Sequence, residues 1–179
     1  IAEATGARVS ATELARMLRS FRGVRRRQEL IGVARGVRVY DDFAHHPSAV
    51  EETIAAIRER HPEGKLVAVF EPRSATACRS LHQSAYERAF AGADVVVLAP
   101  LGRAIAEDER LDLEAIARAA REAGVEAHVP PDLDGVLDAI VRAARQSGDV
   151  VLLMSNGAFG GMPVPLLGAL ALPTPGEIP

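Results

Sequence analysis

The sequence reads Asp41-Asp42-Phe43-Ala44-His45-His46-Pro47 at the junction between an alternating apolar strand and a clear helix start. Two acids and two histidines lie close together in a loop that follows a strand. Open α/β sheets usually place ligand chemistry in such loops. A polar turn that starts a helix at Pro47 would explain the same residue types, because Asp and His are ordinary loop residues. The rest of the chain has to decide between these interpretations.

Short apolar segments alternate with helical segments along the whole chain. The pattern predicts strands over 28–34, 37–40, 66–70, 95–99, 125–129 and 150–154, and helices over 11–21, 48–60, 80–90, 112–123 and 133–145. Such alternation is typical of right-handed βαβ crossovers and a parallel sheet. We therefore expect an α/β, Rossmann-like fold of about six mostly parallel strands, with one antiparallel strand and helices on both faces.

The end of the chain looks different, because it is rich in proline. Pro163, Pro165, Pro173, Pro175 and Pro179 predict little regular structure there, with an irregular tail over 171–179.

Length and composition describe a soluble globular protein. The chain has 179 residues, of which 48% are hydrophobic and 25% charged, and we expect one domain over 1–179. A net charge of -3 gives no basic field for nucleic acid, and no apolar run is long enough to span a membrane. The single cysteine, Cys78, fits a reducing compartment, so we expect a cytoplasmic protein. Because the chain begins with Ile1, we expect it to be excised from a longer protein.

Two further loops at predicted strand ends carry unusual chemistry. Glu71-Pro72-Arg73-Ser74 presents a guanidinium that suits a carboxylate or phosphate, although an exposed arginine paired with a surface acid is equally common. Ser155-Asn156-Gly157-Ala158-Phe159-Gly160-Gly161 allows close backbone approach. It is neither a P-loop nor a dinucleotide fingerprint. The basic run Arg22 to Arg27 adds a local anion site, and nothing around it supports a nucleic-acid patch.

Together these motifs resemble one family. Phe21-x-Gly-Val-x-Arg-Arg, Asp-Asp-Phe-Ala-His-His-Pro, Glu-Pro-Arg-Ser and Ser-Asn-Gly-x-Phe-Gly-Gly occur in this order, and the chain resembles the C-terminal domain of a Mur ligase. Those enzymes are ATP-dependent amide ligases of the peptidoglycan pathway. The histidine pair occurs in the murein peptide ligase branch and in the branch that adds L-alanine. Glu71-Pro72-Arg73-Ser74 favours the first, since the alanine ligases typically have Gln-Pro-His-Arg.

The resemblance implies a function for the parent protein rather than for the fragment. A murein peptide ligase attaches L-alanyl-γ-D-glutamyl-meso-diaminopimelate to UDP-N-acetylmuramate in peptidoglycan recycling, using ATP and Mg²⁺. Its UDP-sugar domain and its central P-loop ATPase domain would be the partners of this one, together with the murein peptide and ATP. The motif G-x-x-x-x-G-K-[ST] is absent from the chain, so we expect the fragment to be inactive alone and to hold no cofactor tightly.

The resemblance also assigns roles to residues. Arg26, Arg27 and Asp42 match the family's nucleotide contacts, with Asp42 toward the ribose. His45 and His46 match the catalytic histidine pair, which would position the incoming amine or take its proton. Substrate binding falls to Arg73, Ser74 and Asn156, with Arg73 facing a peptide carboxylate. No metal site is expected in this domain.

Three other functions fit parts of the pattern. The chain could be the C-terminal domain of the ligase that adds L-alanine, which Arg73 disfavours. It could be a non-catalytic nucleotide-binding module. An oxidoreductase domain is disfavoured, because no predicted strand leads into a dinucleotide fingerprint.

Overall fold

The computed structural model describes residues 9–20 and 24–172. Its strands are β1 (Glu29–Ala34), β2 (Val37–Asp42), β3 (Leu66–Glu71), β4 (Val95–Leu98), β5 (Glu126–His128) and β6 (Val150–Ser155). Its α-helices are α2 (Ala11–Ser20), α3 (Pro47–Arg60), α4 (Gln83–Tyr86), α5 (Leu113–Glu122), α6 (Leu133–Ala143) and α7 (Pro163–Ala171). Two short 3₁₀ helices, η1 (Ser80–His82) and η2 (Phe159–Gly161), lie before α4 and α7.

The strands form one sheet in the order β1-β2-β6-β3-β4-β5. β1 is antiparallel to β2, and every other neighbouring pair is parallel. The hairpin turns at Arg35 and Gly36, whose φ angles of 49° and 82° are the left-handed pair that a tight hairpin needs. The predicted fold class is therefore confirmed. The last strand, β6, inserts between β2 and β3, so loops distant in sequence leave the sheet side by side.

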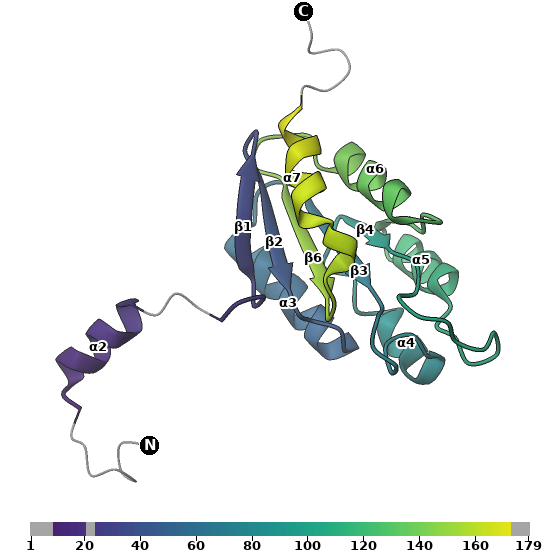
Figure 1. The fold of residues 1–179 in the computed structure, drawn as a ribbon, viewed down its shortest axis with the longest axis horizontal. Helices are drawn as coiled ribbons and strands as arrows, with labels where there is room; N and C mark the ends of the chain where they lie inside the picture. The colour runs from purple at the N-terminus through teal and green to yellow at the C-terminus, as the bar shows by residue number, and fades with distance from the viewer. Residues whose placement is uncertain (1–8, 21–23, 173–179) are drawn as a thin grey trace, which may run out of the picture.

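Helices cover both faces of the sheet (Figure 1). Helices α3, α4 and α5 pack on one face around buried residues such as Ile54, Phe70 and Tyr86. Helices α6 and α7 pack on the other face, where Ile140 and Leu166 are fully buried. The two central strands β3 and β6 are buried along their whole length, as expected for strands covered on both sides.

Helix α2 differs from the others because none of its residues is buried. A capping box starts it, since the Ser10 amide lies 3.0 Å from Glu13 Oε2 and the Glu13 amide lies 3.2 Å from Ser10 Oγ. Its apolar side chains Leu14, Met17 and Leu18 are exposed. Figure 1 draws α2 apart from the sheet.

Two predictions about elements are wrong. Residues 80–90 were expected to form one helix, yet they form η1, α4 and a series of turns that buries Tyr86, Ala89 and Phe90. The proline-rich end was expected to be irregular, yet residues 163–171 form α7. Pro163 and Pro165 lie in the first turn of α7, where a backbone N–H has no helical partner to lose. The predicted irregular tail lies mostly outside the described residues.

The other predicted elements are confirmed to within two residues at each end, except that residue 21, the expected end of the first helix, lies outside the described residues. In the described parts of the chain, no helix is long and apolar enough to cross a membrane.

Candidate functional site

The carboxyl ends of the parallel strands meet at one edge of the sheet. Asp42 pairs in register with Met154, and Glu71 with Ser155, so the loops after β2, β3 and β6 leave the sheet together. These loops carry all the residues predicted for the site except Arg26 and Arg27. Those two arginines lie in the turn before β1, which bonds to the same edge through the Phe43 amide and the Arg26 carbonyl, 2.9 Å apart.

Arg26 holds this turn in place. Its Nε lies 2.9 Å from Asp41 Oδ2, and its Nη2 donates to the Ser155 carbonyl at 2.7 Å. The backbone amide of Arg26 donates to the Glu29 carboxylate at 2.8 Å. Because its donors are used within the domain, Arg26 ties the turn to β2 and β6.

Arg27 has a different environment. Its guanidinium carbon lies 5.7 Å from the centre of the Phe43 ring, a cation–π contact. Within residues 9–20 and 24–172 the Arg27 side chain makes neither a hydrogen bond nor an ion pair. Its planar group is therefore held in place while its N–H donors remain available to a ligand. Arg27 and Asp42 both line a hollow of about 450 Å³ beside α3.

Asp42 is almost completely enclosed, with 2% of its surface exposed. One carboxylate oxygen accepts from the Gln28 amide and the other from the Ala44 amide, each at 2.7 Å. The turn that it anchors contains left-handed φ angles of 55° at Arg26 and 47° at Gln28. These bonds give Asp42 a structural task that the sequence did not indicate, and its role toward a ribose stays a prediction.

The two histidines are oriented by their own loop. His45 Nδ1 lies 3.0 Å from the Phe43 carbonyl, which can only accept, so this nitrogen carries the proton. In the neutral ring Nε2 is then an acceptor that can take a proton. His46 Nδ1 lies 3.0 Å from Ser48 Oγ. The Tyr86 hydroxyl donates to the His45 carbonyl at 2.5 Å, and burial raises the pKa of Tyr86, which keeps it a neutral donor.

His82 is a neighbour that the sequence analysis did not single out. Its ring packs edge-on against the His46 ring, with the centroids 4.8 Å apart. His82 lies in η1, so no local signal in the sequence connects it to the loop after β2.

Arg73 extends from the end of β3, next to the buried Glu71. Its Nη1 lies 3.5 Å from Glu71 Oε1, and 46% of the Arg73 side chain remains exposed. The other Glu71 oxygen accepts from the Ser155 hydroxyl, and Ser155 Oγ accepts from the Gly157 amide at 2.9 Å. Arg73 is therefore anchored at one side of its guanidinium and open on the other.

The remaining two predicted substrate residues differ from each other. Ser74 Oγ accepts from the Ala77 amide at 2.9 Å, which shapes the loop after β3. Asn156 Oδ1 is buried and has no hydrogen-bond partner among the residues that the structure describes. A buried acceptor without a partner is costly, so Asn156 is the better candidate to meet a donor from a ligand.

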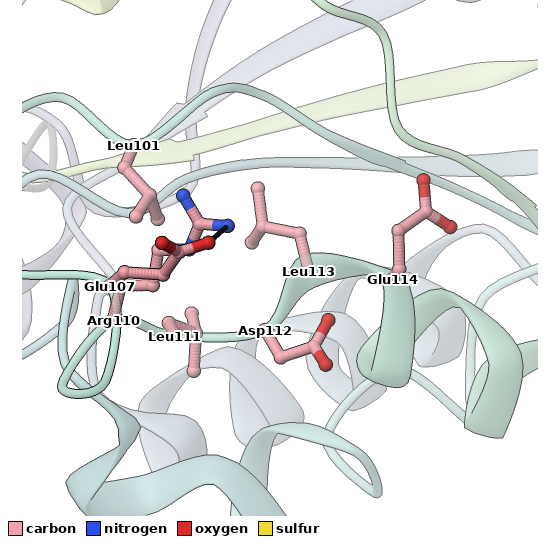
Figure 2. A pocket seen from close by; sticks show the side chains of 7 residues that line it. All are labelled: Leu101, Glu107, Arg110, Leu111, Asp112, Leu113 and Glu114. Atoms are coloured by element: carbon pink, nitrogen blue, oxygen red, sulfur yellow. Dashed lines mark hydrogen bonds and ion pairs between the residues drawn. The ribbon is translucent and has the colours of Figure 1, made fainter.

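A further hollow lies in the loop between β4 and α5. Its volume is about 420 Å³, and it is lined by Leu101, Glu107, Arg110, Leu111, Asp112, Leu113 and Glu114. Figure 2 shows the Arg110 guanidinium between Leu101 and Leu113. Arg110 Nη2 is 3.4 Å from Glu107 Oε1, and both side chains are exposed. Asp112 also caps α5 by accepting from the Ala115 amide. These contacts explain the hollow structurally and point to no ligand.

Cys78 lies behind the loop after β3 and is fully buried. Its thiol donates to the Pro72 carbonyl at 3.1 Å, and burial raises its pKa above the usual range. It is therefore a packing residue rather than a nucleophile. In the described ranges, no three or more His, Cys, Asp or Glu side chains are arranged to hold a metal ion.

The fold and the loop cluster define a doubly wound α/β domain whose candidate-site loops gather at the carboxyl edge of the sheet. The family described as "Mur ligase, glutamate ligase domain" matches residues 26–157, and the chain belongs to this family.

Individual relatives belong to the same group of enzymes. The UDP-N-acetylmuramate–L-alanyl-γ-D-glutamyl-meso-2,6-diaminoheptandioate ligase of Escherichia coli K12 is 38% identical over 96% of this chain and 36% of its own length. The UDP-N-acetylmuramate–L-alanine ligase of Caulobacter vibrioides is 33% identical over 83% of this chain and 32% of its own. The crystal structure of a murein peptide ligase from Psychrobacter arcticus 273-4 superposes with a TM-score of 0.73 at 31% identity, covering 97% of this chain and 36% of that one. The chain thus spans about a third of the length of these curated relatives.

Proposed function

We propose that this chain is the C-terminal domain of a cytoplasmic, ATP-dependent ligase of peptidoglycan recycling. The enzyme would join the tripeptide L-alanyl-γ-D-glutamyl-meso-diaminopimelate to UDP-N-acetylmuramate. The observation that carries the proposal is Arg73, a half-exposed guanidinium anchored by a buried carboxylate at the same edge as the histidine pair. A planar cation held in this way suits a carboxylate of the incoming peptide.

The residues of this domain would position both reactants. Arg73 would bind a peptide carboxylate, and the orphan oxygen of Asn156 would accept a peptide N–H. His45, with Nδ1 protonated, would hold the peptide amine through Nε2 or take its proton, and His46 lies beside it. The amine must lose a proton to become a nucleophile, so a neutral imidazole within reach serves the reaction directly.

The nucleotide fits the other part of the edge. When bound to the parent enzyme, ATP would supply the phosphoryl group that activates the muramyl carboxylate. Arg27 fits a phosphate or an adenine face, because Phe43 holds its guanidinium and its donors are unused within the described residues. Arg26 and Asp42 would support Arg27 by fixing the turn that carries it. We assign Mg²⁺ to the upstream P-loop domain rather than to this one.

The domain organisation proposed for the parent enzyme also accounts for α2. An amphipathic helix with Leu14, Met17 and Leu18 all exposed is expected to bury that face against other protein. The central domain of the parent enzyme is its proposed partner.

A second candidate is the ligase that adds L-alanine, since such a relative is 33% identical. Glu71-Pro72-Arg73-Ser74 favours the peptide ligase, because a fixed guanidinium suits a substrate with several carboxylates. Kinetics with the tripeptide and with alanine as competing substrates distinguish the two.

The test uses the full-length enzyme with Arg73→Ala, Arg73→Lys and Arg27→Ala. Loss of a partly buried ion pair costs about 2–5 kcal/mol. Arg73→Ala should therefore raise KM for the peptide at least about 30-fold and leave KM for ATP nearly unchanged. Arg73→Lys should recover part of this loss, because lysine keeps the charge but cannot donate two parallel hydrogen bonds to a carboxylate. Arg27→Ala should instead raise KM for ATP and leave KM for the peptide nearly unchanged.

Arg118, an exposed arginine on α5, provides a matched control. Arg118→Ala should leave both constants within about two-fold. Unchanged peptide kinetics in Arg73→Ala would remove Arg73 from the site, and preference for alanine over tripeptide would favour the second candidate.

A further inference from the structure

Arg73 lies in a slot between two glycines. β3 lies between β6 and β4 in the sheet, so the loops after both neighbouring strands flank the Arg73 side chain. A Cβ placed on Gly157 would lie 2.1 Å from Arg73 Cδ and 2.5 Å from its Nε. On the other side, a Cβ on Gly102 would lie 2.8 Å from Arg73 Cγ. The space that a side chain would occupy at either glycine is filled by Arg73.

The backbone does not explain these glycines. Neither Gly102 nor Gly157 has a left-handed φ, so an alanine could adopt either conformation. The three atoms nearest to a Cβ on Gly157 all belong to the Arg73 side chain. Glycine at position 157 is therefore explained by the presence of Arg73.

The same loops also fix the two ends of the slot. On one side, the Gly157 amide donates to Ser155 Oγ, the Ser155 hydroxyl donates to Glu71, and Glu71 faces Arg73 Nη1 at 3.5 Å. On the other side, the Gly102 amide donates to the Pro72 carbonyl at 2.8 Å. Arg103 Nε adds a bond of 3.1 Å to the Arg73 carbonyl. The aliphatic part of the Arg73 side chain and one edge of its guanidinium are thus held, while 46% of the side chain stays exposed.

We propose that Gly157 and Gly102, with Glu71 and Ser155, are positioning residues that set the enzyme's specificity for a carboxylate-bearing peptide by holding Arg73 in its binding orientation. This inference rests on the proposed function of Arg73. An arginine loses considerable rotamer freedom when it binds a carboxylate, and a slot that orders it during folding removes this cost from binding. A glycine at position 157 therefore leaves the Arg73 guanidinium pre-organised, whereas a larger residue would make it mobile.

A double-mutant cycle in the full-length enzyme tests the inference. Gly157→Ala should displace Arg73 and raise KM for the peptide nearly as much as Arg73→Ala, about 30-fold or more, with kcat and KM for ATP changed less than about two-fold. The double variant Arg73→Ala/Gly157→Ala should match Arg73→Ala alone, because the added methyl group then displaces nothing. Gly168→Ala, which adds a Cβ into open space on α7, should change none of these values.

Denaturant unfolding of the same variants shows whether a change in KM comes from a loss of stability. The three nearest atoms in the predicted clash all belong to the Arg73 side chain and none to the backbone, so Gly157→Ala should unfold at nearly the wild-type denaturant midpoint once that side chain has moved. If Gly157→Ala is instead unstable, restoration of stability in the double variant supports the inference. Persistent instability in the double variant overturns it, because the methyl group then clashes with something other than Arg73.

The cycle also separates this inference from the proposed function. A raised peptide KM in Arg73→Ala, combined with an unchanged one in Gly157→Ala, overturns the slot alone. The slot is also overturned if the effects of the two substitutions on peptide KM add in the double variant. An unchanged peptide KM in Arg73→Ala overturns the proposed role of Arg73, and with it the specificity role of the slot. The NMR signal of Arg73 Nε–H in the 179-residue chain then reports on the slot itself, since Gly157→Ala should accelerate its solvent exchange.

Discussion

His61 and Tyr40 form a polar pair at the end of α3. The Tyr40 hydroxyl lies 2.8 Å from His61 Nε2, and their rings lie 5.5 Å apart. Burial lowers the pKa of His61 below its usual 6.5, and the nearby charges of Arg38 and Arg60 lower it further. The folded state therefore favours the neutral ring, whose Nε2 accepts a hydrogen bond from the Tyr40 hydroxyl.

This pair predicts a pH dependence of stability. Above pH 6.5 the ring is neutral in both the folded and unfolded chains, and its full contribution is present. As the pH falls below 6.5, the unfolded chain binds a proton first, so the free energy of unfolding decreases until the folded ring titrates as well. His61→Gln should flatten this part of the profile. Denaturant unfolding at a series of pH values measures it, and an identical slope in both proteins would contradict the assignment.

Five of the eight predicted site residues separate into two groups by their partners. The side chains of Arg26, Asp42 and Ser74 are hydrogen-bonded to backbone groups of the domain. Arg27 and Asn156 keep groups without hydrogen-bond partners in the described chain. The sequence predicted that these loops meet at one edge of the sheet, which the structure confirms, and the binding roles of their residues stay predictions. It could not separate the two groups, because the partners come from strands that are distant in sequence.

Asp42 is one of the residues that anchor the turn before β1, together with Arg26. It contains two left-handed residues that are not glycine, Arg26 and Gln28, and such conformations persist only when the surroundings hold them. The carboxylate of Asp42 accepts from the Gln28 amide in this turn and from the Ala44 amide in the loop after β2. An element without regular secondary structure is thereby fixed against the sheet, and it carries Arg27 with it.

Replacing this anchor should destabilise the domain as a whole. Asp42→Ala leaves two enclosed amides without acceptors, which costs about 2–4 kcal/mol. Asp42→Asn should cost less, since it keeps one acceptor oxygen. Asp138→Ala, on the exposed face of α6, is the control and should lie within about 0.5 kcal/mol of the wild type. Urea denaturation measures all three. A stable Asp42→Ala protein with weakened ATP binding would instead favour a direct ribose contact.

At the scale of elements, local signals predicted most of the sheet and its helices. In the structure, Asp112 and Asp132 cap α5 and α6 by accepting from the Ala115 and Gly135 amides. The prediction failed for α7, where prolines were interpreted as breakers although they lie in the first turn. It also failed for residues 80–90, where burial of Tyr86 and Phe90 in the core decides the local path of the backbone.

At the scale of the whole molecule, the insertion of β6 between β2 and β3 brings the loops of the candidate site together. It places Ser155 against Glu71, 84 residues earlier, and thereby links the loop after β6 to Arg73. Alternation of strands and helices predicts a parallel sheet without specifying the order of its strands. The edge that holds the loops could therefore be predicted, whereas the slot around Arg73 could not.

The last prediction concerns what the purified chain can do without the other domains proposed for the parent enzyme. The purified 179-residue chain should fold cooperatively, because both faces of its sheet carry a buried core. It should form no ADP when mixed with ATP, UDP-N-acetylmuramate and the tripeptide. The chain contains no G-x-x-x-x-G-K-[ST] loop to hold the phosphates, and Arg27 alone cannot replace such a cradle. A coupled ADP assay measures this, with the full-length enzyme as the positive control. ADP released by the folded chain above the blank would show that phosphoryl transfer needs less of the parent enzyme than the proposed function requires.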